Sequence, residues 1–480
     1  MTHPDTRLRV RPVTRLLMAD METPISLFLK LRPLGACYLL ESAEQGERMG
    51  RYSFIGIGAM RRLVARQAGI SEITDGHGRR EVHGSPLEGV RSLLAEFDPE
   101  PAGPDLPPFF GGAVGFIGYD LVHYLEPRVP RFRTDDVGWP EAAFVVARDV
   151  VAFDHLTHRV LIIDTCTDGD AERRLDAIES AVRGPQPPEG RRQPGVEPGE
   201  AAANVTPEAY RAMVARAKEH IAAGDAFQVV VSQRLHRPLQ AAPFDVYRAL
   251  RSVNPSPYMY FLDFPEEGLA IAGASPEMLV RVRGAEIESR ATIAGTRPRG
   301  KDAAEDDALA RDLRADPKEC AEHVMLVDLA RNDVGRVAVP GTVKVPELMA
   351  VERYAAVMHM VSAVQGRLLP GKDGFDALAA TFPAGTVSGA PKVRAMEILS
   401  ELEATRRGPY SGCVGYFGWN GNLDTCITLR TVTMTGGRAY IQAGAGIVAD
   451  SDPQREYEEC HHKARALLRA LDLAEGGLPR

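Results

Sequence analysis

Apolar residues recur at three- and four-residue spacing from Pro317 to about residue 330, a pattern that predicts an amphipathic helix. Asp316 precedes it as a cap, and Glu319 stands where a capping box places a carboxylate. Glu319 and Glu322 are three residues apart, so they share the face of the apolar residues. A carboxylate on a buried face is costly unless it is paired or binds a metal, so this face indicates either a metal site or a cap at Glu319 and an arginine partner for Glu322. The apolar positions are Ala321, Val324, Met325 and Leu329.

A second stretch, SDPQREYEECHHK at 451–463, repeats this arrangement. Asp452 and Pro453 start a predicted helix, and Glu456 and Glu459 are again three residues apart. Lys463 lies one turn beyond Glu459, so an ordinary Glu–Lys pair is an alternative interpretation. Two helices that each present a carboxylate pair would form an oxygen-rich site if they face each other. Such a site suits Mg²⁺, which takes one or two carboxylates and keeps several waters.

The rest of the chain mixes short strands with helices, which indicates an α+β fold with largely antiparallel sheets. Residues 184–203 are rich in proline, glycine and charge without periodicity, so they are predicted to be a linker between 1–183 and 204–475. Strands are predicted at 35–42, 51–58, 226–236, 258–263, 268–274, 278–283, 411–419, 424–434 and 438–443, with two more within 141–165. Further helices are predicted at 86–97, 207–223, 303–314, 374–381 and 391–403.

One internal similarity stands out in the glycine pattern. GGAVGFIGY at 111–119 resembles SGCVGYFGW at 411–419, and both read G-x-V-G-aromatic-x-G-aromatic. The glycine spacing does not fit a dinucleotide-binding turn, and no strand–helix–strand unit follows. Glycine-punctuated strands that pack closely against another backbone are the better interpretation.

Composition narrows the classes of partner. The 480 residues carry a net charge of -8 and no basic cluster with interleaved aromatics, which argues against a nucleic-acid partner. The six cysteines are scattered without a CxxC pair, as in reduced cytoplasmic proteins, and no apolar run is long enough to span a membrane. Only 8 of the 57 lysines and arginines are lysine, so a catalytic lysine would have to be one of very few.

Eight segments of the chain together resemble the chorismate-binding enzymes. LLES at 39–42 and NPSPYM at 254–259 add a narrower resemblance to anthranilate synthase component I. The resemblance spans almost the whole chain, and its C-terminal motifs are long and specific. The eight segments are ASPEMLV (274–280), IAGTRPRG (293–300), the 316–336 helix, HMVSAVQG (359–366), FPAGTVSGAPK (382–392), residues 424–430, QAGAGIVADS (442–451) and EYEECHHKA (456–464).

The resemblance implies two large, mainly antiparallel β-sheets with helices on the outside, a regulatory region at 1–183 and a catalytic region at 204–475. In the family, Mg²⁺ bridges the ring carboxylate of chorismate to two glutamates that correspond to Glu322 and Glu459. Glu319 and Glu456 match positions that hold Mg²⁺-bound waters. Without the cation, four carboxylates would repel a substrate that is itself a dianion.

The resemblance places the enolpyruvyl carboxylate of chorismate against an arginine, a tyrosine, a lysine and backbone N–H groups. Arginine is a natural bidentate partner of a carboxylate, and glycines allow backbone amides to approach an anion closely. The alternatives are a strand arginine in a surface ion pair and a plain β-bulge at the glycines. The residues at these positions are Arg430, Tyr410, Lys463, Gly444, Ala445 and Gly446.

The remaining catalytic positions also follow from the resemblance. Glu277 matches the candidate general acid that protonates the departing C4 hydroxyl, which requires a raised pKa. His359 matches a position near the C4 oxygen, although a lone histidine between methionines is also typical of a core. Gly295 and Thr296 would contact the substrate. One departure is Thr292, which replaces the proline common before IAGT.

Two positions distinguish branches of the family. Relatives that use water as nucleophile have a lysine where this chain has Gln228, and aminodeoxychorismate synthases have one where it has Ala294. The absence of both lysines favours ammonia as the nucleophile and anthranilate as the product. Aminodeoxychorismate synthase component I and a catalytically inactive tryptophan-sensing homologue are the alternatives.

Two partners are expected from the same resemblance. The sequence has no glutaminase nucleophile motif of the G-x-C-x-G type, so a separate glutamine amidotransferase subunit should supply ammonia. LLES and PYM match the family's tryptophan site, which predicts feedback inhibition, with an ordinary half-buried strand as the alternative for LLES. The expected inhibitor contacts are Leu40, Ser42, Arg51, Pro257, Tyr258, Met259, Val414, Tyr416, Asp424 and Cys426.

Overall fold

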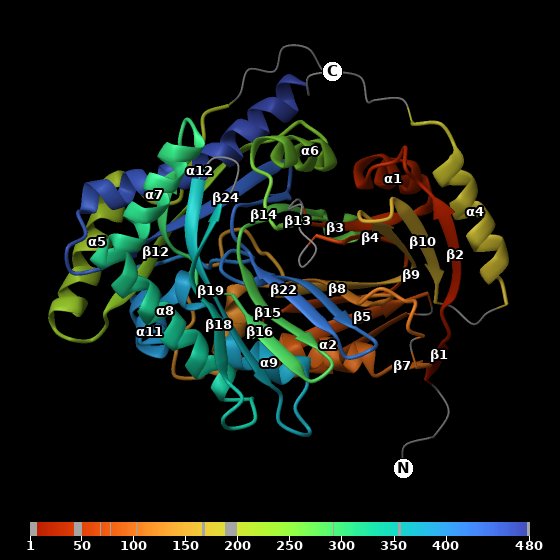
Figure 1. Cartoon of the computed structure of the whole chain (residues 1–480), viewed down its shortest axis with the longest axis horizontal. Coiled ribbons are helices and arrows are strands. Elements are labelled where there is room, and N and C mark those ends of the chain that lie inside the picture. The colour runs from red at the N-terminus through yellow and green to blue at the C-terminus, as the bar shows by residue number, and fades with distance from the viewer. Residues whose placement is uncertain are drawn as a thin grey trace.

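The structure, a computed structural model, describes residues 7–42, 50–67, 69–76, 78–101, 103–165, 169–187, 199–290, 292–353 and 357–477. Residues 188–198 of the predicted linker lie outside these ranges. Two large antiparallel sheets form the centre of the molecule, and helices cover them on the outside (Figure 1). The α+β prediction with mainly antiparallel sheets is therefore confirmed.

The first sheet contains the strand that holds residues 444–446 of the predicted substrate-carboxylate site. It is antiparallel throughout, because each strand pairs with neighbours that run in the opposite direction. Its strand order is β2 (Val13–Met18), β10 (Arg159–Asp164), β9 (Ala142–Asp154), β4 (Tyr52–Arg66), β3 (Ala36–Glu41), β13 (Tyr258–Phe264), β14 (Leu269–Ser275), β23 (Thr431–Thr435), β24 (Arg438–Ile447) and β12 (Gln228–Pro238).

The second sheet shares β4 and β9 with the first, since these two long strands pair with each other along most of their length. In the second sheet β8 pairs with β9 on one side, and β5 pairs with β4 on the other. Its order is β6 (Gly78–His83), β5 (Ile70–Asp75), β4, β9, β8 (Gly112–Ile117), β21 (Cys413–Gly418), β22 (Leu423–Ile427), β15 (Met278–Arg283), β16 (Glu286–Ser289), β19 (Val357–Arg367) and β18 (Lys344–Arg353), with β17 (Ala294–Pro298) also on β19.

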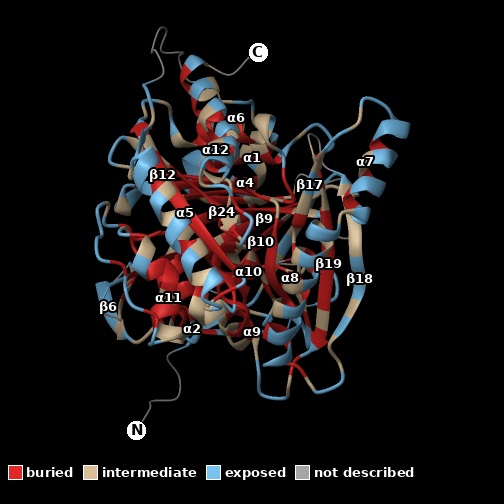
Figure 2. Cartoon of the chain, turned by 90° about the vertical axis from the view of Figure 1, so that its left-hand side faces the viewer, coloured by how far each residue is buried: buried red, intermediate tan, exposed pale blue. Residues whose placement is uncertain are grey.

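Helices pack on both sheets, and their outer faces are exposed while the strands beneath them are buried (Figure 2). Those of the first sheet are α1 (Pro24–Leu31), α4 (Ala171–Arg183), α5 (Pro207–Ala222), α6 (Pro243–Val253), α11 (Lys392–Leu402) and α12 (Pro453–Gly476). Those of the second are α2 (Pro86–Leu94), α7 (Ala303–Ala315), α8 (Pro317–Gly335) and α9 (Gly374–Thr381). The short elements are β1 (Leu8–Val10), β7 (Phe97–Pro99), β11 (Ala202–Ala203), β20 (Gly389–Ala390), α3 (Val122–Leu125) and α10 (Gly385–Ser388).

Strands from before and after residues 184–203 pair with each other in both sheets. In the first sheet β3 pairs with β13, so that Glu41 lies opposite Met259. In the second sheet β8 pairs with β21, the two strands of the repeated glycine pattern, and Gly115 lies opposite Gly415. A Cβ at either glycine would stand 2.0 Å from a backbone carbonyl oxygen, which confirms that these glycines permit close backbone packing.

Two details of the predicted elements are wrong. The stretch 424–434 is two strands, β22 and β23, because Arg430 adopts a positive φ of 48° and breaks the ladder between them. The buried face of α8 is also not the predicted one: Val324 is 46% exposed, whereas His323 and Leu326 are buried. Glu319 and Glu322 consequently lie at the margin of the buried face and are half-buried.

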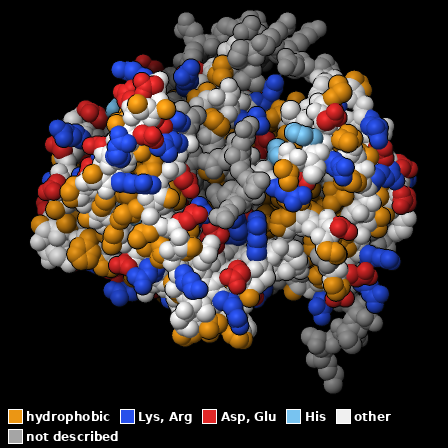
Figure 3. Space-filling model, viewed as in Figure 1, with side chains coloured by type: hydrophobic (Ala, Val, Ile, Leu, Met, Phe, Trp, Pro, Cys, Tyr) orange, Lys and Arg blue, Asp and Glu red, His pale blue; other side chains and the backbone are white. Residues whose placement is uncertain are grey.

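The surface is mixed in character. Acidic, basic and apolar side chains are interspersed on the face seen in Figure 3. Among the described helices, none combines the length and apolar character that a membrane crossing requires.

Candidate active site

The start of α8 and the start of β12 meet at the first carboxylate pair. Gln228 Nε2 donates a 2.7 Å hydrogen bond to Glu322 Oε1, so Glu322 bonds an amide and not the arginine considered from the sequence. A Cβ at Gly446 of β24 would stand 2.7 Å from the same Nε2. Gln228 therefore lies between Glu322 and the glycine segment, and its own Oε1 is buried with no hydrogen bond to the described part of the chain.

Glu319 lies one turn before Glu322, beside the strand that contains Gly295. A Cβ at Gly295 would stand 3.1 Å from Glu319 Oε2, and Arg297 Nη1 lies 3.6 Å from Glu319 Oε1. Burial raises the pKa of Glu319, and the negative charges of Glu322 and Asp316 raise it further. The carboxylate pair on α8 is thus under mutual repulsion that a cation would relieve.

The second carboxylate pair lies at the start of α12. Burial and the charge of Glu459 raise the pKa of Glu456, whereas Lys463 and Lys318 lower it. Lys318 belongs to α8, so the two helix starts are within electrostatic reach of each other. Lys463 Nζ lies 2.7 Å from Glu459 Oε1 and donates a 2.9 Å hydrogen bond to Gly444 O.

The four carboxylates suit Mg²⁺ by their chemistry. Their oxygens are hard ligands, and two of them have raised pKa values because of burial and neighbouring negative charge. Within the described residues, no three His, Cys, Asp or Glu side chains converge tightly enough to form a cage made by the protein alone. Mg²⁺ commonly completes its coordination with waters and substrate oxygens, so the donor set fits this ion.

A half-buried arginine, Arg430, lies within electrostatic reach of Glu459. Burial lowers the pKa of Arg430, while Tyr410 and Glu459 oppose that shift. Among the described residues, its guanidinium has no ion pair or hydrogen bond, so it is available to an anion. A Cβ at Gly444 would stand 2.8 Å from Tyr410 Oη, which places the tyrosine hydroxyl against the glycine segment.

The glycine segment 444–446 also has backbone N–H groups to offer. It pairs with Ser232, Val231 and Val230 of β12 along one edge. β23 covers the other edge of β24 only as far as Ile441. Since alternate residues of an antiparallel strand direct their N–H groups to opposite edges, at least one N–H of this segment points away from β12.

His359 lies on β19 and contacts the neighbouring strand β17. Its Nδ1 is 3.0 Å from Thr296 Oγ1 and 3.2 Å from Gly295 O. Burial lowers the pKa of His359, and the positive charges of Arg430 and Lys463 lower it further. The histidine is therefore neutral at neutral pH and within electrostatic reach of the groups that would bind a substrate carboxylate.

Glu277 is buried at the base of the site. Its Oε1 accepts a 3.4 Å hydrogen bond from the backbone N–H of Ile293. Burial raises the pKa of Glu277 to about 8, so the carboxyl is mainly protonated at neutral pH, as a general acid requires. The hydroxyl of Thr386 in α10 also acts on this carboxyl and is otherwise buried without a hydrogen bond.

Thr386 was missed from the sequence, although the GTVS segment that contains it was noted. The sequence signal that could have identified Thr386 is a small polar residue between two glycines, Gly385 and Gly389. Arg407 was also missed: it is fully buried, bonds Glu403 and Val230 O, and donates to Ser411 Oγ beside Tyr410.

The predicted inhibitor residues gather on the shared sheets. Leu40 pairs with Tyr260, and the neighbouring Met259 pairs with Glu41. Tyr258 Oη donates a 3.0 Å hydrogen bond to Asp424 Oδ1. Val414 pairs with Cys426 and Tyr416 with Asp424 on the adjoining strands, and Pro257 directly precedes Tyr258.

Two of these residues have distinct surroundings. The Ser42 hydroxyl is buried and has no hydrogen bond to any residue that the structure describes, whereas Arg51 is paired with Asp154 at 2.9 Å and is half-exposed. Arg281, which the sequence analysis did not select, donates a 2.8 Å hydrogen bond to Asp424 and a 3.2 Å bond to Tyr258 Oη. Asp424 is therefore held by two neighbours.

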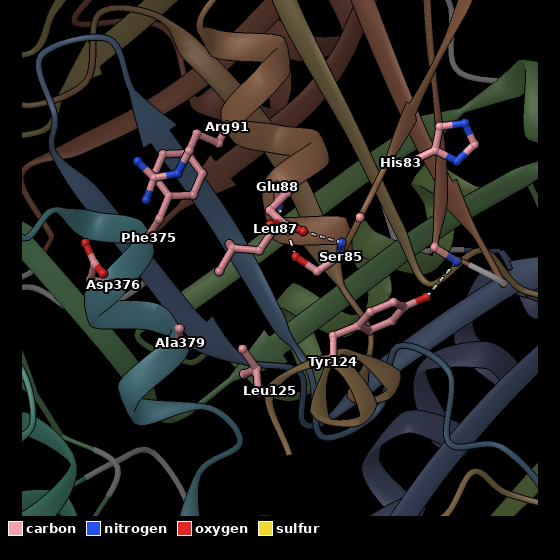
Figure 4. Close-up of a pocket in the computed structure, with 12 residues that line it drawn as sticks. His83, Ser85, Leu87, Glu88, Arg91, Tyr124, Leu125, Phe375, Asp376 and Ala379 are labelled. Carbon is pink, nitrogen blue, oxygen red and sulfur yellow. Dashed lines mark hydrogen bonds between the residues drawn. The ribbon is translucent and has the colours of Figure 1, made fainter. Parts of the chain in front are cut away.

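A separate pocket of about 710 Å³ lies between α2 and α9 and contains none of the predicted residues. Figure 4 shows Arg91 of α2 beside Phe375 of α9, with its guanidinium 4.3 Å from the ring centroid. Arg91 is paired with Asp373, and Glu88 caps its own helix at Ser85. The charged groups of the pocket are thus engaged within the protein, and the catalytic candidates lie elsewhere.

Comparison with known proteins identifies the family. The sequence profile of the chorismate binding enzyme family matches residues 35–469. The chain belongs to this family. Within it, anthranilate synthase component 1 of Thermus thermophilus is 50% identical over 479 residues, which are 98% of this chain and 100% of that protein. Component 1 of Pseudomonas aeruginosa is 46% identical over 478 residues, 97% of this chain and 96% of that protein.

Solved structures of chorismate-binding enzymes share the fold. Anthranilate synthase component I from Streptococcus pneumoniae has a TM-score of 0.79 at 37% identity, covering 88% of this chain and 94% of that one. The menaquinone-specific isochorismate synthase from Escherichia coli has a TM-score of 0.74 at 19% identity, covering 97% and 95%. The chain is therefore a chorismate-binding enzyme of the anthranilate synthase component I group.

Proposed function

We propose that this chorismate-binding enzyme converts chorismate and ammonia into anthranilate and pyruvate, as the large subunit of an anthranilate synthase and the first step of tryptophan synthesis. The observation that carries the proposal is the hydrogen bond from the amide of Gln228 to Glu322, together with the small side chain of Ala294 at the second distinguishing position. An amide cannot serve as a general base for water, and alanine offers no amine. Ammonia then has to enter as a free molecule.

Magnesium is part of the proposal. Glu322 and Glu459 would hold Mg²⁺ directly, and Glu319 and Glu456 would hold its waters. The bound ion would offset the charge of these carboxylates and fix the ring carboxylate of the substrate. Arg430, Tyr410, Lys463 and the N–H groups of 444–446 would bind the enolpyruvyl carboxylate, since the guanidinium has no competing ion pair among the described residues.

Proton transfers divide between two groups in this proposal. Ammonia attacks C2, and Glu277 donates its proton to the C4 hydroxyl, which leaves as water. Loss of the C2 proton and of pyruvate then restores the aromatic ring. Neutral His359, held by Thr296 and Gly295, is placed to accept a proton near the departing groups.

The isolated chain is expected to form anthranilate from chorismate, Mg²⁺ and an ammonium salt, but not from glutamine. Because ammonia and not ammonium is the nucleophile, the rate at fixed total ammonium should increase with pH from neutral. Anthranilate fluorescence measures the product directly. Glutamine-dependent activity of the purified chain, without an amidotransferase subunit, would contradict the proposed partner, and a product other than anthranilate would contradict the assigned reaction.

Tryptophan is proposed as a feedback inhibitor bound between β3, β13 and β21. The Ser42 hydroxyl, which has no hydrogen-bond partner within the described ranges, and nearby backbone groups offer hydrogen bonds to its polar end. Pro257, Tyr258 and Met259 offer an apolar slot. Arg281 fixes the carboxylate of Asp424 by a hydrogen bond.

Ser42→Phe is expected to relieve inhibition by tryptophan, because the larger side chain fills the slot. The concentration of tryptophan for half inhibition should increase at least about tenfold, which corresponds to roughly 1.4 kcal/mol of lost binding. Ser42→Ala is the control for the hydroxyl alone. Both variants should keep the chorismate KM of the native chain without tryptophan. Unchanged sensitivity in Ser42→Phe would place the inhibitor elsewhere.

A further inference from the structure

The edge of β19 beside the site contains a gap in its ladder. β16 pairs with β19 as far as Ser289 opposite Val364, and β17 resumes at Ala294 opposite Met360. Among the described residues, none is paired with Ser362 in the ladder at this edge. A buried strand residue with an unpaired N–H and C=O is costly, so another group has to satisfy it.

The hydroxyl of Thr292 satisfies both groups. Thr292 Oγ1 accepts a 3.1 Å hydrogen bond from Ser362 N and donates a 2.6 Å bond to Ser362 O. Both residues are fully buried at 0% exposure, so water does not substitute for these bonds. A proline at 292 would have no hydroxyl and could make neither bond.

Ser362 is in turn bonded to two further elements. Its Oγ lies 2.6 Å from His323 Nε2 on α8 and accepts a 2.9 Å hydrogen bond from Met349 N on β18. His323 directly follows Glu322 and is fully buried. The network therefore ties α8, β18 and β19 to the segment that begins at Thr292.

That segment carries groups of the proposed reaction. Ile293, the next residue, donates its N–H to Glu277 Oε1. Gly295 O and Thr296 Oγ1 then contact His359, which lies three residues before Ser362 on β19. A shift of the segment by a fraction of an ångström would move the acid, the histidine and the substrate contacts relative to one another.

We propose that Thr292 is a positioning residue, which acts through Ser362 and His323 to hold the 292–296 segment in register with the general acid and the histidine. The effects that this inference predicts on kcat and KM rest on the proposed function. The residue does not contact the substrate, so its effect should appear in kcat more than in the chorismate KM. The groups expected to bind the substrate carboxylate, Arg430 and Lys463, lie on other elements and stay in place.

Thr292→Val tests the proposal because valine keeps the shape and removes the hydroxyl. We expect kcat to fall by about 10- to 100-fold, the range that a small misplacement of reacting groups costs. The chorismate KM should change by less than about threefold. Thr292→Ser keeps the hydroxyl and should restore kcat to within about threefold of the native value.

Thr342→Val is the matched control. Thr342 Oγ1 also donates to a backbone carbonyl, Val339 O at 2.6 Å, and accepts from a backbone N–H, Arg367 N at 3.2 Å, at the far end of β19. Because Thr342 is half-buried and water can replace part of its bonding, the variant should lose less thermal stability than Thr292→Val and should keep its kcat. Equal loss of kcat in both valine variants, or failure of Thr292→Ser to recover, would reduce Thr292 to a structural residue and overturn the proposal.

Hydrogen exchange measured by mass spectrometry separates this inference from the proposed function. In Thr292→Val, peptides covering 286–298 and 357–367 should lose protection, while in Thr342→Val protection near 292 should remain. Unchanged exchange near 292 in Thr292→Val would overturn the positioning role. A native chain that makes no anthranilate would overturn the proposed function instead, and the exchange data would still decide whether the hydroxyl holds this segment.

Discussion

Glu322→Gln is expected to abolish anthranilate formation while the fold survives. The glutamine oxygen can still accept the hydrogen bond from Gln228, so the substitution removes mainly one negative charge and one strong oxygen ligand. If Glu322 holds Mg²⁺ as proposed, its loss removes several kcal/mol of stabilisation, and about 4 kcal/mol corresponds to about a thousandfold in rate. Glu459→Gln should behave alike and also frees Lys463 from its ion pair.

The measurement is anthranilate fluorescence against MgCl₂ concentration, with the thermal unfolding midpoint as the check on folding. Asp328→Asn is the matched control, because Asp328 lies on the same helix and pairs with Arg331 in an exposed position. It should retain native activity. Full activity of either glutamate variant, or native activity that persists in excess EDTA, would rule out these glutamates as ligands of a required ion.

Features that depend on neighbouring residues were predictable from the sequence. α8 and α12 begin at Pro317 and Pro453, as the Asp-Pro pairs indicated, since a cap and a first-turn proline act within a few residues. In both helices the capping aspartate accepts hydrogen bonds from backbone N–H groups of the first turn. The antiparallel arrangement followed from hairpin spacing for the same reason.

Features that depend on distant parts of the chain were not predictable. The buried face of α8 is set by His323, whose partner Ser362 is 39 residues away. The end of β22 is set by the positive φ of Arg430, a conformation that β-prone flanking residues do not signal. The glycine repeat suggested close packing, but only the structure shows that its two copies are partners in one ladder.

The candidate site shows the same division. Motif resemblance selected Glu277 and Arg430. Burial raises the pKa of Glu277, as a general acid needs, and among the described residues the guanidinium of Arg430 has no ion pair. The resemblance did not select Thr386 or Thr292, because a threonine acts here through contacts that only the folded chain creates. The magnesium ligands, the substrate contacts and the inhibitor site remain predictions.

Ala294→Lys is expected to lose most anthranilate synthesis, by at least about tenfold, and to trap a covalent adduct with chorismate. Ala294 is buried at 5% exposure and pairs with Met360, next to His359. If residues 293–296 lie where the family resemblance places them, a lysine at 294 would extend its amine toward C2 of the bound ring. A positioned nucleophile has an effective molarity of up to about 10⁵ M or more in the best cases, so it could compete with millimolar ammonia.

The protonation state of that lysine determines how much of the covalent adduct forms. Burial and the charge of Arg430 favour the neutral, nucleophilic amine, whereas the glutamates of α8 and α12 favour the protonated form. Attack at C2 with loss of the C4 hydroxyl as water would join the lysine nitrogen to the ring. The protein mass would then increase by that of chorismate minus water, which mass spectrometry detects after incubation with chorismate and Mg²⁺.

Ala294→Met separates blocking from chemistry, because methionine has a similar length and no amine. It should lose activity without any gain in mass, whereas Ala294→Lys should lose activity and gain the adduct. Native ammonia-dependent rates in Ala294→Lys would mean that residue 294 does not face the ring. The choice of anthranilate over aminodeoxychorismate would then lose its main support, since that choice depends on a small side chain at 294 that leaves C2 open to ammonia.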